Sequence, residues 1–405
     1  MKRLRSNRGI AIITAILALA FLTYLATEVT YDATVEYAVN SQGLKRLKAY
    51  YAARAGVEVS LLRIKAYQQA AQQLGAEAAA SPMVNLIWQF PLQWPLVLPD
   101  ANVNLSLSDK EALNESKEGT FFDATFDTQI SDEGSKIDLN DLASPSRILK
   151  ENARRQLLNV FFQEIESNRR FEAKYRNYRF EELINQIADF MSSQRMSLNG
   201  GDKMAAYSNT EYQGYPPNRN FRTLSELRVL PLMEEDFFRL LENRVTIFGL
   251  KGINPNTATK EVLMSLDVGI TAEIADRLIQ RRNTQAEGGP YRNPQDFWTS
   301  VQAFGARLNA NPDEIPIVTE PLNSFRIKST GVYGNVRAQI EVIVVDFDRV
   351  ATRVADFVKK ENPPSPGSPS PGPNPVPQPP AQPPGAAQPG GQRQGPPRIV
   401  YWFES

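Results

Sequence analysis

The residue types available for chemistry are few, because the 405 residues include no histidine and no cysteine. Their absence excludes a Ser-His-Asp or Cys-His catalytic arrangement and a zinc site with histidine or cysteine ligands. A bound metal would need oxygen ligands, which favours calcium or magnesium. No catalytic arrangement of carboxylates, lysines, tyrosines or serines stands out either. We therefore expect a protein that is not an enzyme.

The charge balance bears on the class of partner. Lysines and arginines number 45, aspartates and glutamates also number 45, and the net charge is zero. This balance removes the global electrostatic argument for nucleic acid or anionic lipid as the main partner. A hydrophobic content of 42% in a chain of this length is enough for two or three domains with their own cores.

The N-terminus holds the clearest candidate for a processing site. An uncharged apolar run from Ile10 to about Ala26 follows Gly9 directly, and four basic residues precede that glycine: Lys2, Arg3, Arg5 and Arg8. A helix of roughly 17–20 apolar residues spans about 30 Å of hydrocarbon, whereas a signal-peptide core has about 7–15. We expect a retained anchor with residues 1–9 in the cytoplasm. A signal peptide cleaved near the small residues 18–20 is the alternative.

The helical pattern continues beyond this apolar run. Apolar residues recur at spacings of three to five from Val35 to Ala66, without a proline and with only Gly43 and Gly56 as weak breakers. Such a stripe is typical of an amphipathic helix that packs on a soluble domain. The sequence therefore predicts one long helix, which ends in the Pro- and Trp-rich residues 76–100.

Strand and helix patterns alternate in the rest of the chain. We expect strands at 102–108 and 120–134, helices at 179–194 and within 251–283, a hairpin at 323–348 and a last strand at 398–404. Residues 363–397 are rich in proline, glycine, serine and glutamine and have too few apolar groups to fold. A strand beyond such a tether suggests docking on the same sheet. We expect Trp88, Trp94 and Trp298 to be core residues rather than a substrate site.

Two short helices joined at Gly269 have the pattern of a helix-hairpin-helix unit. Asn254, Asn256 and Thr257 predict a turn and a helix cap ahead of it. Such a unit binds the DNA backbone when two hairpin glycines bring N–H groups onto a phosphate. Thr271 stands in the place of the second glycine. We therefore favour a helical packing unit and expect no nucleic acid, with DNA binding as the alternative.

A short basic leader, a glycine and a retained apolar helix that becomes amphipathic resemble the type IV prepilin class. In that class a membrane aspartyl peptidase cuts after the glycine and methylates the new N-terminus. The resemblance implies a cut between Gly9 and Ile10. The class usually has glutamate at the fifth mature position, where this chain has Thr14. One family that commonly lacks this glutamate is minor pseudopilin K, the tip protein of the type II secretion pseudopilus.

Motifs further along the chain are similar to those of the K family and come in the same order. An acidic glycine turn followed by a helix matches at Gly134, Ile137, Leu139, Asn140 and Leu142. The helix with Asp-Trp-x-Asp and its glycine-rich acidic loop match at Asp189, Gly200, Gly201, Asp202 and Tyr207. A loop with proline and asparagine leads at 215–230 into a helix start for which Thr223 or Ser225 is the expected N-cap.

The resemblance implies an α+β fold. A long N-terminal helix would pack on a pilin-like antiparallel sheet, with an inserted, mostly helical domain that contains the helix-hairpin-helix-like unit. The expected divisions are a leader (1–9), a transmembrane half-helix (10–28), an amphipathic half-helix (29–75), the first part of the β domain (76–139), the inserted helical domain (140–322), return strands (323–350), a Pro-rich linker (351–397) and a C-terminal strand (398–405).

The resemblance also implies a function, namely a minor pseudopilin of the general secretion pathway that helps to initiate the pseudopilus for export of folded proteins. Its partners would be the I- and J-type minor pseudopilins, the inner-membrane platform and the prepilin peptidase. The protein would cross the bacterial inner membrane once, with its bulk in the periplasm. A minor pilin of a type IV pilus and a membrane-anchored DNA-binding protein are the alternatives.

The resemblance raises the question of whether this chain binds calcium. The family's helical domain is associated with calcium, held by carboxylates of the loop after the Asp-Trp-x-Asp helix. Here Phe190 stands for the tryptophan, and Ser192 and Gln194 stand where acids are usual. Asp189 and Asp202 fit caps or surface acids better than ligands. Because calcium affinity depends on charged oxygens, we expect weak binding or none, and no cofactor.

Overall fold

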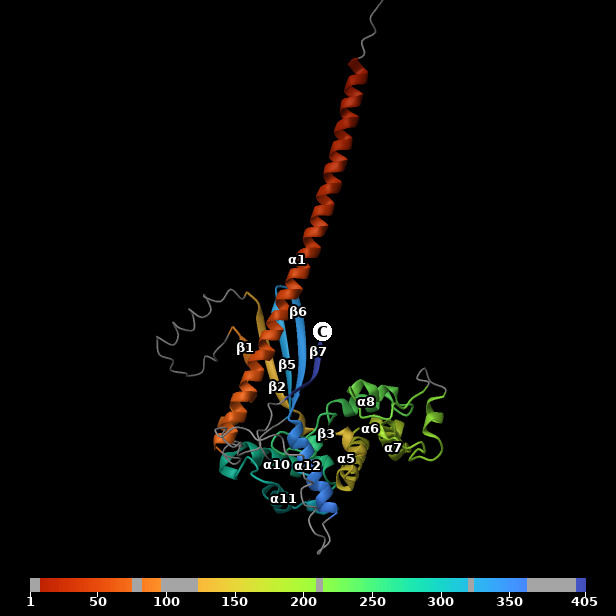
Figure 1. Ribbon diagram of the computed structural model, residues 1–405, viewed down its shortest axis with the longest axis vertical. Coiled ribbons are helices and arrows are strands. Elements are labelled where there is room, and N and C mark those ends of the chain that lie inside the picture. The colour runs from red at the N-terminus through yellow and green to blue at the C-terminus, as the bar shows by residue number, and fades with distance from the viewer. Residues whose placement is uncertain (1–7, 75–81, 96–122, 209–213, 320–323, 363–397) are drawn as a thin grey trace, which may run out of the picture.

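The computed structural model describes residues 8–74, 82–95, 123–208, 214–319, 324–362 and 398–405. A long helix stands on one side of a sheet, and a block of shorter helices lies at the end of the sheet that is far from the N-terminus (Figure 1). The expected strand at 102–108 lies outside the described residues.

The long helix is continuous, as the sequence predicted. Helix α1 spans Arg8–Leu74. Its first part is exposed along its whole length, and its side chains become buried only where the sheet begins. The buried residues of α1 recur at spacings of three to four and include Ala49, Ala53, Val57, Ile64 and Tyr67. This spacing places one helical face on the sheet.

The sheet has five antiparallel strands in the order β1-β2-β5-β6-β7. They are β1 (Leu92–Trp94), β2 (Thr125–Asp132), β5 (Ser324–Tyr333), β6 (Val336–Val345) and β7 (Arg398–Glu404). Strands β5 and β6 form the expected hairpin, which turns at Gly334 with a φ of 59°. Strand β7 pairs with β6, which confirms that the last strand docks on this sheet.

The core between α1 and the sheet is apolar and aromatic. Ile130, Phe325, Ile327 and Val342 pack against the buried face of the helix. Helix α3 (Pro82–Gln89) adds Trp88, whose ring meets Tyr67 and Phe325 edge to face. Trp88 and Trp298 are buried, and Trp94 packs partly buried beside Phe126, so the three tryptophans are core residues as expected.

The helical block lies between β2 and β5 in the chain. Its longer helices are α5 (Arg147–Ser167), α6 (Arg169–Tyr175), α7 (Phe180–Met191), α8 (Glu235–Glu242), α9 (Lys260–Ser265), α10 (Ala272–Asn283) and α11 (Pro294–Ala303). Short 3-10 turns are η1 (Glu133–Ser135), η2 (Leu139–Ala143), η3 (Lys203–Tyr207), η4 (Leu224–Val229), η5 (Gln285–Glu287) and η6 (Pro312–Glu314). A small parallel pair joins β3 (Ile137–Asp138) to β4 (Val245–Thr246).

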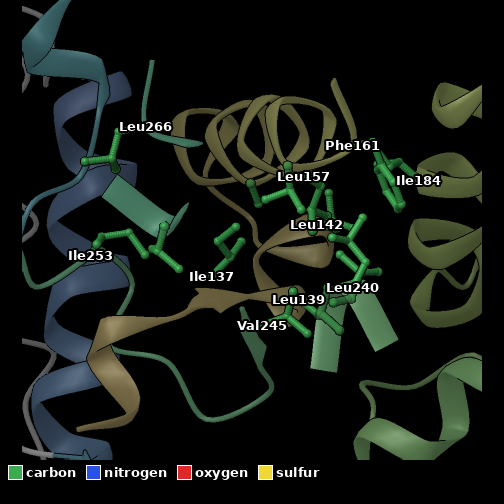
Figure 2. Packing of buried hydrophobic residues seen from close by; sticks show 14 of the residues in the cluster. Ile137, Leu139, Leu142, Leu157, Phe161, Ile184, Leu240, Val245, Ile253 and Leu266 are labelled. Carbon is green, nitrogen blue, oxygen red and sulfur yellow. The ribbon is translucent and has the colours of Figure 1, made fainter. Parts of the chain in front are cut away.

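One apolar cluster holds this block together. Figure 2 shows Leu142, Leu157, Phe161 and Ile184 among the side chains that fill the space around β3 and β4. Phe161 stacks on Phe180 at 4.5 Å between ring centroids, which ties α5 to the start of α7. The helix predicted at 179–194 is confirmed as α7.

One local prediction needs correction. Residues 347–361 form helix α12 (Phe347–Glu361), although we expected return strands to 350 and a linker from 351. Asp346 caps this helix by accepting from Arg349 N, and apolar residues repeat on one face, so the helix has its own local signals. Thr223 is the N-cap residue of η4, as expected, and its side chain makes no capping hydrogen bond.

Candidate functional site

The exposed part of α1 is the first candidate site. The segment Ala11–Ala71 contains a window with a mean hydropathy of 2.0, none of which is buried, so by length and composition this helix is able to cross a membrane. Gly9 and Ile10 lie in the first turns of α1. Thr14 is exposed, and its hydroxyl donates a hydrogen bond to the carbonyl oxygen of Ala11, 3.0 Å away in the same helix.

Large apolar side chains remain exposed beyond the uncharged apolar run. Those between the apolar run and the sheet are Val29, Tyr31, Val35, Tyr37, Val39, Leu44 and Leu47. Exposed apolar side chains in such number are candidates for a contact with lipid or with another chain.

The C-terminal half of α1 packs closely on the sheet at two glycines, Gly56 of α1 and Gly331 of β5. A Cβ at Gly331 of β5 would lie 2.1 Å from the carbonyl oxygen of Ala49 and 2.3 Å from the nitrogen of Ala53. A Cβ at Gly56 of α1 would lie 2.3 Å from the hydroxyl of Ser329. The helix and the sheet therefore approach closely only because side chains are missing on both sides.

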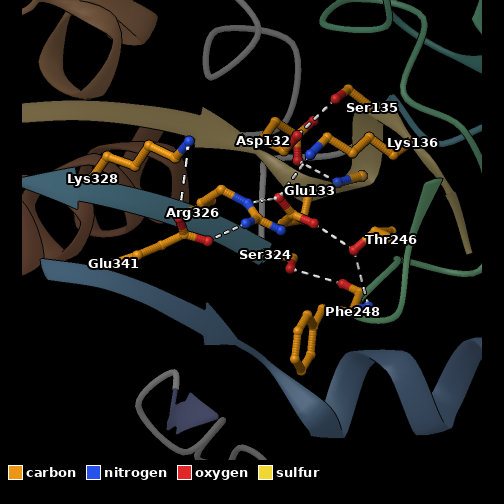
Figure 3. A network of polar contacts seen from close by, with 11 residues as sticks. Asp132, Glu133, Ser135, Lys136, Thr246, Phe248, Ser324, Arg326, Lys328 and Glu341 are labelled. Atoms are coloured by element: carbon orange, nitrogen blue, oxygen red, sulfur yellow. Dashed lines mark hydrogen bonds and ion pairs between the residues drawn. The ribbon is translucent and has the colours of Figure 1, made fainter. Parts of the chain in front are cut away.

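A buried ion network joins the sheet to the helical block. Glu133 follows β2, has no exposed side-chain surface, and binds Arg326 of β5, Lys136 and the hydroxyl of Thr246 (Figure 3). Arg326 also pairs with Glu341 of β6. Burial alone would raise the pKa of Glu133, but the hydrogen bond from Arg326 and the two cations hold it below its usual value.

Asp132 makes a second link next to Glu133. Its carboxylate accepts from Gly134 N at 2.8 Å, Asn254 Nδ2 at 3.0 Å and Thr257 Oγ1 at 2.6 Å. Burial raises the pKa of Asp132 to about 6, although the hydrogen bonds from these three donors lower it. The predicted turn at Asn254 exists, because its Oδ1 accepts from the nitrogen of Asn256.

The predicted cap at Thr257 is wrong. Its hydroxyl donates to Asp132, and Thr259 caps α9 instead by accepting from Val262 N. Thr257 therefore ties the start of the hairpin unit to the end of β2.

A buried lysine lies between two carboxylates nearby. Lys251 Nζ is 2.6 Å from Asp138 Oδ2 and 2.7 Å from Asp141 Oδ1. Burial, and then the charge of Asp138, raise the pKa of Asp141 to about 7. Burial would lower the pKa of Lys251, but the two acids raise it above its ordinary value. A small cavity with room for about one water lies against Asp138 and Asp141.

The helix-hairpin-helix-like turn is closed by an internal acid. Helices α9 and α10 meet at Gly269, as predicted, and Thr271 caps α10. The buried carboxylate of Asp267 accepts from Gly269 N at 2.8 Å, from Asn309 N at 3.1 Å and from Ala310 N at 3.0 Å. A phosphate would need such N–H groups, and here a carboxylate already binds them.

The loop after α7 brings together several residues that the sequence singled out. Asp189 accepts from Ser197 Oγ at 2.6 Å and from Leu198 N at 3.1 Å. Asp202 caps η3 through Met204 N at 3.0 Å and pairs with Arg195 at 2.9 Å.

The other residues of interest in this loop are Ser192, Gln194 and Tyr207. Ser192 accepts from Gln194 N, and the side chain of Gln194 is exposed. Tyr207 is buried, as expected. Within the described part of the chain, no three acidic side chains gather in a way that could hold a metal ion.

Several charged residues at these sites were missed by the sequence reasoning. Arg326, Lys203 and Lys251 are buried or nearly so. Arg326 binds Glu133, 193 positions away, Lys251 binds Asp138, 113 positions away, and Lys203 binds oxygens 11 to 15 positions away. Arg326 lies between Phe325 and Ile327 on the opposite face of β5, where the alternating pattern predicts an exposed side chain. Lys203 stands in a polar loop and Lys251 beside apolar residues, and the local pattern of neither marks a buried cation.

Two segments of the chain match models of one family. Residues 135–249 and residues 253–316 each match a family described as type II secretion system (T2SS), protein K. A solved structure of the GspK-GspI-GspJ complex from the enterotoxigenic Escherichia coli type 2 secretion system contains a similar chain, with 17% identity and a TM-score of 0.45 over 55% of this chain and 75% of that chain. The comparison with curated proteins gave no match.

Proposed function

Since this chain belongs to the type II secretion system protein K family, we propose that this minor pseudopilin lies at the tip of the pseudopilus and helps to initiate its assembly. The observation that carries the proposal is the place of the helical block. It is inserted between β2 and β5 and lies at the end of the molecule opposite the membrane helix (Figure 1). A subunit stacked above this one would collide with the helical block, whereas a subunit at the tip has no neighbour above it.

Thr14 supports the same position. In the prepilin class a glutamate at this place is thought to pair with the terminal amine of a subunit already in the filament. Thr14 offers no carboxylate, and its hydroxyl is bonded within α1. A subunit with no neighbour above it needs no such partner, and a buried charge without one costs several kcal/mol.

The anchor and its processing follow from the same membership. We propose that a prepilin peptidase cuts between Gly9 and Ile10 and that Ile10 is then methylated. The apolar half of α1 stays in the bacterial inner membrane, with the N-terminus in the cytoplasm and the sheet and helical block in the periplasm. The basic residues ahead of Gly9 are in accord with that orientation.

The proposed partners are the I- and J-type minor pseudopilins and the inner-membrane platform. Support comes from the apolar side chains of α1 that neither lipid nor the sheet would cover, Val35, Val39 and Leu44 among them. Helices of neighbouring subunits are the natural cover for such a stripe. We propose neither catalysis nor DNA binding, and the hydrogen bond from the hairpin amide of Gly269 to Asp267 supports the second point.

Secretion by a strain that lacks this chain tests the proposal. Loss of export of folded proteins, restored by the full chain but not by a chain without residues 10–28, is the expected result. Photo-crosslinks from position 39 to I- and J-type subunits would identify the neighbours. Normal export in the deletion strain with loss of surface pili would favour a pilus subunit, and salt-dependent retention of DNA by the full chain would favour the DNA-binding alternative.

A further inference from the structure

An ammonium group holds the loop that follows α7. Lys203 is only 5% exposed, although it follows two glycines in a polar loop. Its Nζ donates to the carbonyl oxygen of Asp189 at 3.1 Å, to that of Ser192 at 2.5 Å and to Asn218 Oδ1 at 2.6 Å. Three oxygens therefore take up the three N–H bonds of the ammonium.

These three oxygens come from two separate segments. Asp189 and Ser192 lie at the end of α7, and Asn218 belongs to the loop ahead of η4, where it has a φ of 56°. A positive φ is costly for a non-glycine residue, so tertiary contacts must hold Asn218 in place. The hydrogen bond from Lys203 is such a contact, and it gathers both loops around one positive charge.

The family's helical domain is associated with calcium in this region, and the residues present here do not fit that ion. Calcium takes six to eight oxygens at about 2.3–2.6 Å, several of them charged. The two nearby carboxylates already have partners, Asp189 with Ser197 and Leu198, and Asp202 with Arg195 and Met204. The oxygens that do converge are two carbonyls and one amide, and they bind an ammonium.

We propose that the ammonium of Lys203 takes the place of the divalent cation in this protein, so that the loop from 192 to 207 folds without calcium and does not bind it. A divalent ion near this position would be repelled by the ammonium and would have to displace it from three short hydrogen bonds. The loss of acids at Ser192 and Gln194 is then matched by the gain of a cation at Lys203. This proposal does not depend on where the subunit lies in the pseudopilus.

Thermal melting of the full chain in detergent tests the calcium part directly. The wild-type melting temperature should be the same in millimolar Ca²⁺ and in excess chelator, and calorimetry with Ca²⁺ should give no binding heat. A rise of many degrees with Ca²⁺, or micromolar binding, would overturn the proposal. This comparison needs no variant, so its result stands whether or not a substituted chain folds.

The lysine itself is tested by Lys203→Met, which keeps the length of the side chain and removes the charge. Three oxygens then lose their donor, so the melting temperature should fall by roughly 4–8 °C. Lys150→Met, on the exposed surface of α5, is the matched control and should change little. Hydrogen exchange should quicken at the amide of Leu198, which lies in this loop, and stay the same in α1. Unchanged melting and exchange in Lys203→Met would show that the ammonium does not hold the loop.

Discussion

The guanidinium of Arg326 binds the fully buried carboxylate of Glu133 at the point where the chain leaves the sheet for the helical block. Arg326 belongs to β5, the strand by which the chain returns to the sheet, so one ion pair joins the two ends of the inserted block. The hydrogen bond from Thr257 to Asp132, the residue before Glu133, crosses the same junction. Polar contacts therefore attach the block to the sheet at this junction.

Arg326→Met should destabilise the whole chain. The substitution leaves Glu133 buried beside a single weaker cation and leaves Glu341 without its close partner. Breaking a buried pair in this way costs about 3–5 kcal/mol of unfolding free energy. Urea denaturation measures this loss. Glu151→Gln, which breaks an exposed pair with Arg147, is the control and should cost less than about 0.5 kcal/mol. Equal effects of the two variants would contradict the role given to Glu133.

Gly43 and Gly56 of α1 should respond in opposite directions to alanine. Gly56→Ala places a methyl group within 3 Å of Ser329, Thr128 and Phe126, so it should destabilise the seat of the helix by about 1–3 kcal/mol. Gly43 has nothing within 4 Å of its Cβ position, so Gly43→Ala should stabilise by about 0.5–1 kcal/mol through helix propensity. Denaturation of both variants in the same detergent tests the difference. A stabilising Gly56→Ala would show that the helix does not pack this closely.

How much of this structure the sequence predicts depends on the range of the interaction. Helix α1, the β5–β6 hairpin and the docking of β7 follow from local periodicity and turn residues, and all three were predicted. Helix α12 was not predicted, because it lies between the strand β6 and the Pro-rich tract and the linker was expected to begin at 351.

The long-range polar sites could not be predicted in the same way. Thr257 lies where a helix cap is expected, yet its hydroxyl donates a hydrogen bond to Asp132, which lies 125 positions away. The oxygens around Lys203 likewise come from two different loops. A partner that only the fold brings near leaves no local pattern in the sequence, and this explains why the polar junction and the internal ammonium appear only in the structure.

Asp141 should give the chain a measurable pH dependence. Its pKa is raised from 3.8 to about 7 in the folded chain, so the folded state keeps a proton that the unfolded chain releases. Stability from this group is therefore present at low pH and is lost as the pH rises from about 4 to about 7. Relative to Asp141→Asn, the wild type should lose unfolding free energy on the order of a few kcal/mol across this window and none above it. Parallel pH profiles of the two chains would contradict the raised pKa.

Gly9→Val should block processing. A side chain at this position obstructs the extended backbone that a prepilin peptidase needs, so the uncut chain should accumulate in the membrane. Mass spectrometry of the N-terminus distinguishes the two forms, and the wild type should begin at a methylated Ile10. A mature N-terminus near residue 20 or later would instead restore the signal-peptide interpretation.

Thr14→Glu should impair secretion rather than improve it. If the subunit lies uppermost, no terminal amine of another subunit lies above it, and the new carboxylate would be buried in the membrane half of α1 without a partner, at a cost of several kcal/mol. Thr14→Gln has a similar size and no charge, so it is the matched control and should secrete nearly as well as the wild type. The measurement is the fraction of a secreted folded protein found in the medium, with membrane levels of each variant compared by immunoblot. If Thr14→Glu secretes as well as the wild type or better, a partner amine is present above position 14, and the subunit lies within the filament rather than at its tip.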